Sequence, residues 1–297
     1  MTKKPVLLVL AALAIPATAN AQSLPDGVTA KGYVEYEHLT SDGDDASGII
    51  GDFDVSVAPF MGGVGLDFGL IGLDFEGTSE SALFGALTYH VGNHKFSVGV
   101  PRSVLKDHTR MPDVGGVRYF GFETGLITDG IVDIAYLTSD EAPLGVRYDG
   151  DFGMVKVGAS YHHFSDGADA DVFGLGATYT RDIWFASASV EHFDADGHNG
   201  TLFHTEIGAK TDLYEAGIGL SNGDDGYFDD TSIMAWGSYY VMPQLALNAS
   251  VLDVGSTTIY GVGADYTFWN GAYAQLGYLD SDDAFDGIWD VSLGWKF

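Results

Sequence analysis

The sequence predicts an all-β fold, a transmembrane antiparallel up-and-down β-barrel of roughly sixteen strands. Three observations lead to this prediction. Apolar residues alternate with small or polar ones in many segments, which is the two-residue period of strands with one apolar face. Short polar connections also alternate along the chain with longer acidic ones, as in a meander of neighbouring strands. Finally, 41 glycines and 13% aromatic residues suit many strands joined by tight turns.

The first element is a predicted secretory signal peptide at residues 1–21. Lys3 and Lys4 precede an apolar run from Val6 to Ile15, and Ala19-Asn20-Ala21 follows it. A basic start, a short apolar core and a small-x-small site are typical of a cleaved signal. The run is shorter than the roughly 20 residues of a spanning helix. We therefore expect export, cleavage after Ala21 and a mature barrel at residues 22–297.

The mature chain is strongly acidic. Of 13 Lys and Arg, two lie in the signal peptide, which leaves 13 − 2 = 11 against 42 Asp and Glu, a formal charge of −31. Such a balance argues against nucleic acid as a partner, because phosphates require a basic surface. The carboxylates cluster in segments expected to be solvated loops, such as "SDGDDASG" (41–48) and "SNGDDGYFDD" (221–230). With no cysteine, stability must come from burial and backbone pairing.

The strands follow from the alternation. At the end of the chain, Trp289, Val291, Leu293, Trp295 and Phe297 share one face, opposite small or charged residues. A spanning strand takes about 10 residues, so sixteen strands, one loop at 102–143 and connections of about five residues account for the mature chain. We predict strands at 28–39, 52–60, 63–76, 83–90, 95–101, 144–149, 152–164, 172–180, 183–193, 202–210, 213–221, 232–241, 244–252, 258–267, 272–280 and 287–297.

Two barrel architectures fit alternating strands. A water-soluble barrel or sandwich turns its apolar faces inward, whereas a transmembrane barrel turns them to lipid around a polar lumen. The polar faces here are rich in Gly, Ser and Thr with few charges, unlike soluble surfaces rich in Lys and Glu. Aromatic residues such as Trp184, Trp269 and Trp295 fall at strand ends, where a membrane–water boundary favours them. The transmembrane arrangement is therefore favoured.

The mature chain resembles the sixteen-stranded general porins of bacterial outer membranes, most closely those of the alpha-proteobacterial type. The resemblance rests on the terminal strand "WDVSLGWKF" and on the segment "APLGVRYDGDFGMVKVGASYHHFSDG" (142–167). It also rests on the position of the longest loop, between the fifth and sixth strands. The resemblance implies that loop 102–143 folds into the barrel as a constriction. It further implies that Trp295 and Phe297 form the signal read by the outer-membrane barrel assembly machinery.

The resemblance also implies where the pore constriction lies. Five of the eleven mature basic residues fall between 95 and 118, and Arg147 follows the loop. In porins, acids of the infolded loop face arginines and lysines on the wall across a narrow aqueous gap. Alternation directs Arg147, Lys156 and Lys31 toward the lumen. Arg102, Arg110 and Arg118 lie within or beside the loop, and its own acids are the alternative partners for them. We assign the constriction to Arg102, Lys106, Asp107, Arg110, Asp113, Arg118, Glu123, Asp129, Arg147, Lys156 and Lys31.

The expected function is a water-filled channel of the Gram-negative outer membrane for passive diffusion of small hydrophilic solutes and ions, with a modest cation preference. The resemblance implies a homotrimer, and small outward residues such as Ala30 and Gly32 would allow close subunit contact. A substrate-specific outer-membrane channel is the alternative, and a rim-active enzyme or adhesive barrel is a further one. His162-His163 near Asp166, or His192 near Asp194, could supply a base. No serine nucleophile in a recognisable context accompanies them, so no enzyme is expected.

No cofactor or specific metal site is expected. "DADGHNG" (194–200) begins like a calcium loop but lacks its third acidic position and distal glutamate. "GGVGLDFGL" (62–70) matches one copy of a calcium-binding nonapeptide, and a stack needs several. Loose calcium on the acidic external loops stays open. In the family that the chain resembles, divalent cations bridge such loops to lipopolysaccharide, which with outer-membrane lipid is the expected environment.

Overall fold

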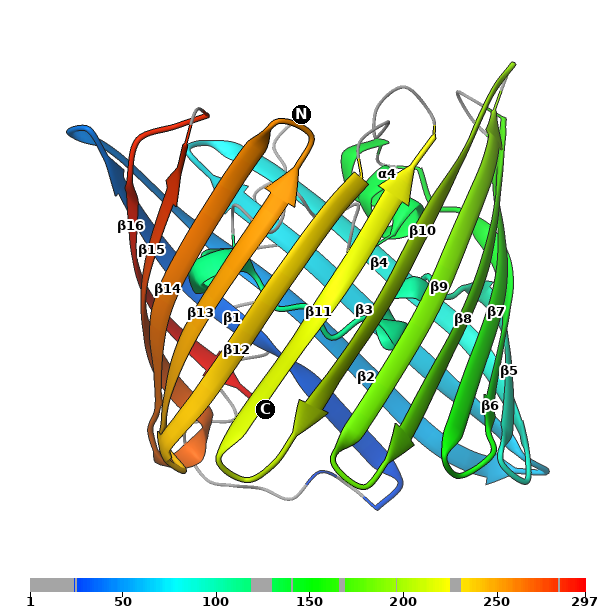
Figure 1. The fold of residues 1–297 in the computed structure, drawn as a ribbon. Helices are drawn as coiled ribbons and strands as arrows, with labels where there is room; N and C mark the ends of the chain where they lie inside the picture. Colours follow the sequence, from blue (N-terminus) through cyan, green and yellow to red (C-terminus); the bar gives the residue numbers. More distant parts are fainter. Residues whose placement is uncertain are drawn as a thin grey trace.

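The computed structural model describes residues 24, 26–118, 130–139, 141–165, 169–195, 197–224, 231–282 and 284–297. The predicted signal peptide lies outside this part of the chain. Each strand pairs antiparallel with its sequence neighbours, and β1 also pairs with β16, which closes a barrel of sixteen strands (Figure 1). The predicted fold class is confirmed. The strands are β1 (Val28–Ser41), β2 (Asp44–Met61), β3 (Val64–Phe75), β4 (Thr78–Val91), β5 (His94–Val100), β6 (Leu144–Asp151), β7 (Val155–Phe164), β8 (Ala170–Arg181), β9 (Trp184–Ala195), β10 (His198–Lys210), β11 (Tyr214–Gly223), β12 (Thr231–Met242), β13 (Leu245–Val254), β14 (Thr257–Thr267), β15 (Ala272–Ser281) and β16 (Ile288–Lys296).

The two ends of the barrel differ in their connections. The connections after odd-numbered strands form the upper rim, at the top of Figure 1, and those after even-numbered strands form the lower rim. The lower connections are all short. The one between β14 and β15 contains a 3-10 turn, η4 (Trp269–Gly271). The upper rim carries the longest connection, residues 101–143, between β5 and β6.

The predicted starts of two strands are wrong, and β4 starts at Thr78 instead of residue 83. β2 was expected to start at residue 52, but it starts at Asp44. Asp42 and Gly43 take positive φ values of 49° and 88°, which suits a two-residue hairpin turn. The strands can therefore pair up to Ser41 and Asp44. The acidic segment 41–48 looked like a loop because its composition is polar, but most of it lengthens the β1–β2 hairpin.

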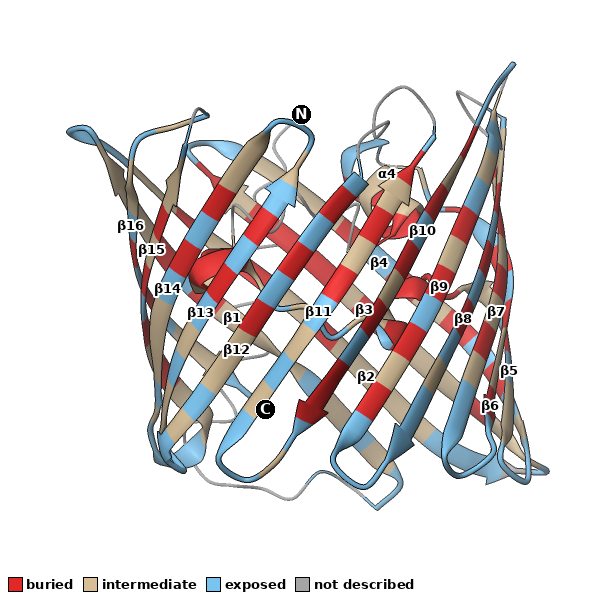
Figure 2. Cartoon of the chain, viewed as in Figure 1, coloured by how far each residue is buried: buried red, intermediate tan, exposed pale blue. Residues whose placement is uncertain are grey.

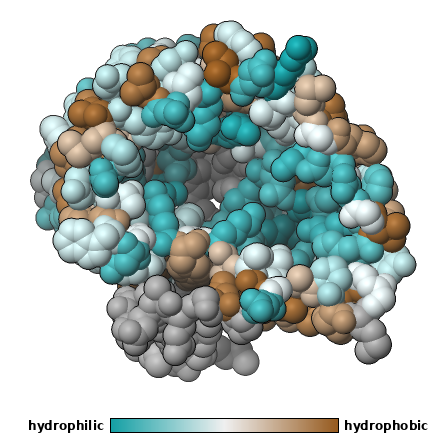
Figure 3. Space-filling view, turned by 90° about the horizontal axis from the view of Figure 1, so that it is seen from below, coloured by the Kyte–Doolittle hydropathy of each residue, from teal (hydrophilic) through white to brown (hydrophobic). Residues whose placement is uncertain are grey.

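The outer surface of the barrel is apolar and the lumen is polar. Exposed and buried residues alternate along the strands (Figure 2). The exposed positions are large and apolar, as in Leu144 (66% exposed) and Leu293 (59%), whereas the inward positions include Glu35 (1%) and Ser292. Figure 3 shows hydrophilic side chains lining the opening of the barrel. These faces are oriented as a transmembrane barrel requires.

The seam between the first and last strands includes Phe297. Its N–H donates to the carbonyl of Gly32 and its carbonyl accepts from the N–H of Gly32, both at 3.1 Å. Its ring stacks on Phe53 of β2, with the ring centroids 5.1 Å apart. Phe297 therefore joins three strands at the point where the barrel closes.

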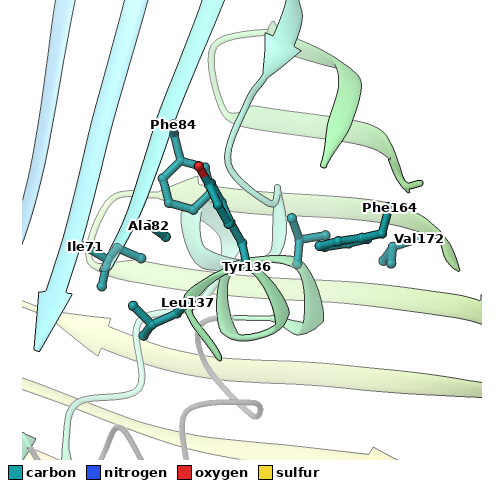
Figure 4. Close-up of a cluster of buried hydrophobic side chains, with 8 residues drawn as sticks. Ile71, Ala82, Phe84, Tyr136, Leu137, Phe164 and Val172 are labelled. Atoms are coloured by element: carbon teal, nitrogen blue, oxygen red, sulfur yellow. The ribbon is translucent and has the colours of Figure 1, made fainter. Parts of the chain in front are cut away.

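The described residues of the connection between β5 and β6 fold inside the barrel. They form two 3-10 turns, η1 (Leu105–His108) and η2 (Val114–Gly116), and the helix α4 (Ile131–Ser139). α4 packs its Tyr136 and Leu137 against Ile71, Ala82 and Phe84 of the wall (Figure 4). The Tyr136 hydroxyl donates to the carbonyl of Leu83 at 3.0 Å. No helix within the described residues is long and apolar enough to cross a membrane.

Candidate functional site

The first half of the infolded loop lies on glycines of the wall. The Nδ1 atom of His108 in η1 lies 2.8 Å from the Thr178 hydroxyl of β8. The ring covers Gly158 and Gly176, where a Cβ atom would meet it at 3.0 Å or less. η1 thus reaches the wall at a place where neighbouring strands carry no side chain.

η2 packs on a second set of wall glycines, which we call its glycine seat. Gly115, with φ of 62°, lies against Gly263 and Gly277 of β14 and β15. A Cβ at these two positions would approach the Gly115 carbonyl to 2.6 and 2.7 Å, closer than real Cβ contacts. The Gly115 N–H donates to the Ser250 hydroxyl at 3.1 Å. The backbone of η2 therefore packs directly on the backbone of the wall.

Between η1 and η2, and again just after η2, cations of the loop bind carboxylates of the wall. The Arg110 N–H donates to Glu206 at 2.8 Å, and its guanidinium lies 3.7 Å from Glu215. The Arg118 N–H donates to Glu37 at 2.9 Å, and Arg118 Nε lies 3.0 Å from Glu35. The loop is thus fixed to β10, β11 and β1 in turn.

The loop and five strands share one continuous ion-pair chain, in which cations and carboxylates alternate. Arg147 on β6 is near its centre and pairs with Asp149 at 2.6 Å and with Asp107 of η1. At the other end, Arg102 pairs with Asp52 at 2.5 Å and with Asp54 at 2.8 Å. In order, the ion-pair chain runs through Asp67, Lys95, Asp149, Arg147, Asp107, Lys31, Asp54, Arg102, Asp52 and Lys106, with Asp133 of α4 also 3.5 Å from Arg102.

Charges in the loop are stabilised by these partners. Burial would raise the pKa of Asp107, but Arg147 lowers it to about 2. Burial would lower the pKa of Arg102, yet the carboxylates of Asp52, Asp133 and Asp54 raise it above its ordinary value. The pKa of His108 is lowered, chiefly by burial, which favours the neutral ring beside Thr178. The loop therefore keeps fixed charges at neutral pH, with a neutral histidine between them.

α4 is attached at its N-terminus. Glu191 of β9 accepts the Ile131 N–H at 2.5 Å and also the Ser103 hydroxyl. A carboxylate at this position satisfies an otherwise unpaired N–H and interacts favourably with the helix dipole. Glu191 therefore connects the start of the loop to its helix.

The polarity of the constriction differs from the expectation. We expected acids of the loop to face basic residues on the wall. Instead, Arg102, Lys106, Arg110 and Arg118 of the loop face wall carboxylates. The pairs of Asp107 with Arg147 and Lys31 have the expected polarity, a carboxylate of the loop facing cations of the wall. The reason is that β1, β2, β10 and β11 carry more acids that face the loop than cations, since Lys31 and Lys210 are the basic residues of these four strands.

The structure brings most of the assigned residues together. Asp113 pairs with Arg118 at 3.3 Å, and Trp295 lies in β16 opposite Val34. Lys156 points into the lumen below the loop and has no carboxylate partner within the described residues. Glu123 and Asp129 lie outside the described part of the chain. Sequence reasoning missed Asp52, Asp54, Asp67, Asp149, Glu206 and Glu191, although alternation along their strands places each on a polar face.

An open space, which we call the passage, remains beside the loop. A space of about 600 Å³ is bordered by Lys106, Asp113 and Arg118 of the loop on one side. The opposite wall contributes Tyr240, Asn248, Asp265 and Gln275. Two further spaces lie on the β1–β7 side. A chamber of about 290 Å³ lies against the start of the loop, and a vestibule of about 640 Å³ opens at the lower rim.

The rim histidines do not form a recognisable catalytic group. His163 Nδ1 lies 3.0 Å from Asp171, and His192 Nδ1 lies 3.0 Å from the Thr201 hydroxyl. His162 lies buried with Nε2 at 2.9 Å from the Pro101 carbonyl. Asp166 lies outside the described residues. In the described ranges, no three acidic or histidine side chains gather closely enough to hold a metal ion.

A closed sixteen-stranded barrel narrowed by a loop between β5 and β6 is the porin fold. Among solved structures, a variant of the Rhodopseudomonas blastica porin superimposes with a TM-score of 0.63 at 16% identity, covering 91% of this chain and 100% of that chain. A second variant gives a TM-score of 0.62 at 17% identity over the same shares. No family model matches the chain, and no curated protein matches it significantly. The likeness confirms the predicted fold.

Proposed function

We propose that the protein is a porin of the Gram-negative outer membrane through which small hydrophilic solutes and ions diffuse passively. The observation that carries this proposal is the passage of about 600 Å³ left between the infolded loop and the opposite wall. The passage is lined by charged and amide side chains that can replace water around a polar solute. The apolar outer face supports insertion into lipid.

Recording from planar bilayers tests this proposal. The purified protein should add discrete, ohmic conductance steps, and liposomes that contain it should swell in small neutral sugars. Protein that inserts into the bilayer but adds no conductance would contradict a diffusion pore. A substrate-specific channel is the second candidate, favoured by the side chamber of about 290 Å³, and saturable block of the current by one solute class would indicate it.

The cellular setting is part of the same proposal. The chain would be exported, lose residues 1–21, be folded by the barrel assembly machinery and lie among outer-membrane lipid and lipopolysaccharide. Mass spectrometry of membrane-extracted protein tests cleavage after Ala21. Homotrimers would form through the outer face of the first strands, where Ala30 and Gly32 present little bulk. Light scattering of the detergent-solubilised protein distinguishes a trimer from a monomer.

A further inference from the structure

Basic side chains concentrate around the chamber of about 290 Å³ beside the start of the loop. Five of the eleven Lys and Arg residues beyond the predicted signal line it, together with three carboxylates. The lining therefore carries a formal 5 − 3 = +2, whereas the chain beyond the signal carries 11 − 42 = −31. Asp52, Asp133 and Asp149, which together pair with four of these cations, do not line the chamber. The lining cations are Lys31, Lys95, Arg102, Lys106 and Arg147.

Two of these cations, Lys31 and Lys95, have N–H groups available to donate to a ligand. Arg147 donates to two carboxylates and to the carbonyls of Arg102 and Ser103, so its guanidinium is fully used. A lysine ammonium has three donors. Lys95 contacts Asp67 at 3.0 Å and Asp149 at 3.5 Å. Lys31 has only long contacts of 3.5 and 4.0 Å, and its side chain is 71% exposed, so it can turn toward a bound molecule.

A buried hydroxyl provides an independent sign of a ligand. Ser97 shares the lumen face of β5 with Lys95 and lies opposite Arg147 in the pairing of β5 with β6. It is 5% exposed and lines the chamber, and its hydroxyl has no hydrogen-bond partner within the described residues. A buried hydroxyl without a partner is costly, so such groups usually have one. An acceptor oxygen in the chamber would satisfy it.

The chamber is accessible from the lower side. Lys31, Lys95, Asp107 and Arg147 line both the chamber and the vestibule of about 640 Å³ at the lower rim. A small solute in the vestibule therefore meets the two available ammonium groups first. Lys156 lines the vestibule but not the chamber.

We propose that the chamber binds a small oxyanion of the phosphate class, held by the ammonium groups of Lys31 and Lys95 and by the hydroxyl of Ser97. Its tetrahedral oxygens accept hydrogen bonds from several directions, which matches donors on neighbouring strands. The inference deepens the proposed function and rests on it only for the route of entry. It gives an otherwise acidic pore one place where an anion is retained.

Calorimetric titration of the detergent-solubilised, folded protein with inorganic phosphate at constant ionic strength tests this inference. We expect Lys95→Met, Lys31→Gln and Ser97→Ala each to weaken binding, the lysine variants by roughly tenfold, which is about 1.4 kcal/mol. Lys156→Gln is the matched control, because it removes a lumen lysine outside the chamber, and it should bind like the wild type. Lys31 is largely exposed, so its variant should fold normally.

Bilayer recording of the same preparations separates the two proposals. Normal conductance without phosphate binding by the wild type would overturn the chamber and leave the pore intact. Equal weakening by Lys156→Gln would show general electrostatic attraction and would overturn it as well. Phosphate binding by a protein that does not conduct would support the chamber and contradict the diffusion pore.

Discussion

At the scale of single residues, Arg147 has more than an electrostatic role. Alternation predicts only that it faces the lumen. In the structure its Nη1 donates to the Ser103 carbonyl at 2.9 Å and to the Arg102 carbonyl at 3.3 Å, so it holds the first turn of the loop. Its partner Asp107 comes from η1, which no local pattern connects to β6. The residues of this contact could be identified from the sequence, but their pairing could not.

The Asp107–Arg147 pair makes a prediction about pH. The pKa of Asp107 in the folded protein, about 2, lies below the ordinary value of 3.8 for an aspartate. Because the folded pKa is depressed, the stabilisation from this carboxylate is present above about pH 4 and is lost as the pH falls toward 2. Asp107→Asn should therefore increase the current noise of single channels at pH 7 and pH 5. The difference from the wild type should vanish near pH 2.

Arg181→Gln serves as the control for this pH series, since Arg181 lies at the end of β8 and contacts only Asp182 among the ion pairs of the described residues. Its noise should match the wild type at every pH. A wild type that already behaves like Asp107→Asn at pH 5 would contradict the low pKa.

Phe297 gives a second prediction at this scale. Phe297→Ala removes the ring that stacks on Phe53 across the seam, and such aromatic contacts contribute about 0.5–1.5 kcal/mol beyond area burial. The variant should unfold at a lower temperature in detergent and reach the outer membrane in lower yield. Phe268→Ala, at the lower rim and away from the seam, is the comparison. Equal yield and equal thermal stability of wild type and Phe297→Ala would refute a role in closure.

At the scale of elements, the strands and the place of the loop between β5 and β6 were predictable, but the contacts by which the loop docks on the wall were not. Alternation is local, so β5 to β16 fall within a few residues of their predicted bounds, for example β16 at Ile288–Lys296 against 287–297. The loop is positioned by contacts between residues far apart, such as Gly115 with Gly263 and Gly277. Glycine repeats such as "YGVG" (260–263) could signal a docking surface, but they do not say which segment docks there.

The glycine seat of η2 can be filled by mutation. Gly263→Val would place side-chain atoms where the Gly115 carbonyl lies, since even a Cβ would be 2.6 Å away. Overpacking of this kind typically costs about 1–3 kcal/mol, which should displace η2 rather than β14. Single-channel conductance should change and become noisier. Gly237→Ala is the matched control, because its nearest new contact is 3.7 Å, and a Gly263→Val channel identical to it would contradict the seat.

Removing the loop tests its position as a whole. A deletion of residues 104–139 with a short glycine bridge should raise conductance, because the loop occupies the lumen beside the passage. It would also expose Ile71, Phe84 and Val172, which pack under α4, and remove the loop N–H that Glu206 of the wall accepts. We therefore expect a folded barrel with lower thermal stability. A deletion that folds normally with unchanged conductance would show that the loop lies outside the path of ions.

At the scale of the whole molecule, charge is distributed unequally between the two ends. All eleven Lys and Arg residues beyond the predicted signal lie in the infolded loop, on β6 beside it or toward the lower rim. The other connections of the upper rim contain none. Carboxylates near that rim include Asp42, Asp45, Glu76, Asp169, Asp224, Asp253, Asp282 and Asp286. The upper mouth is thus acidic, whereas charges near the lower mouth are mixed.

This asymmetry predicts rectification of the ionic current. Cations are enriched at the acidic upper mouth, where they carry most of the current. Near the lower mouth, cations and anions both carry the current. When the upper side is positive, cations move from the enriched region toward the loop, and salt accumulates there. When the polarity is reversed, salt is depleted and the current falls. The current should therefore be larger with the upper side positive, alongside a modest cation preference in a salt gradient.

Salt and rim variants test this prediction, because screening shortens the Debye length from about 10 Å at 0.1 M to about 3 Å at 1 M. Channels inserted from one side should rectify at 0.1 M and become nearly ohmic at 1 M. Replacing Asp42, Asp45 and Asp286 by Asn should reduce rectification at 0.1 M while leaving the conductance at 1 M unchanged. Asp212→Asn at the lower rim should leave the rectification intact. Symmetric currents at 0.1 M in the wild type would mean that the upper carboxylates lie too far from the ion path to act on it.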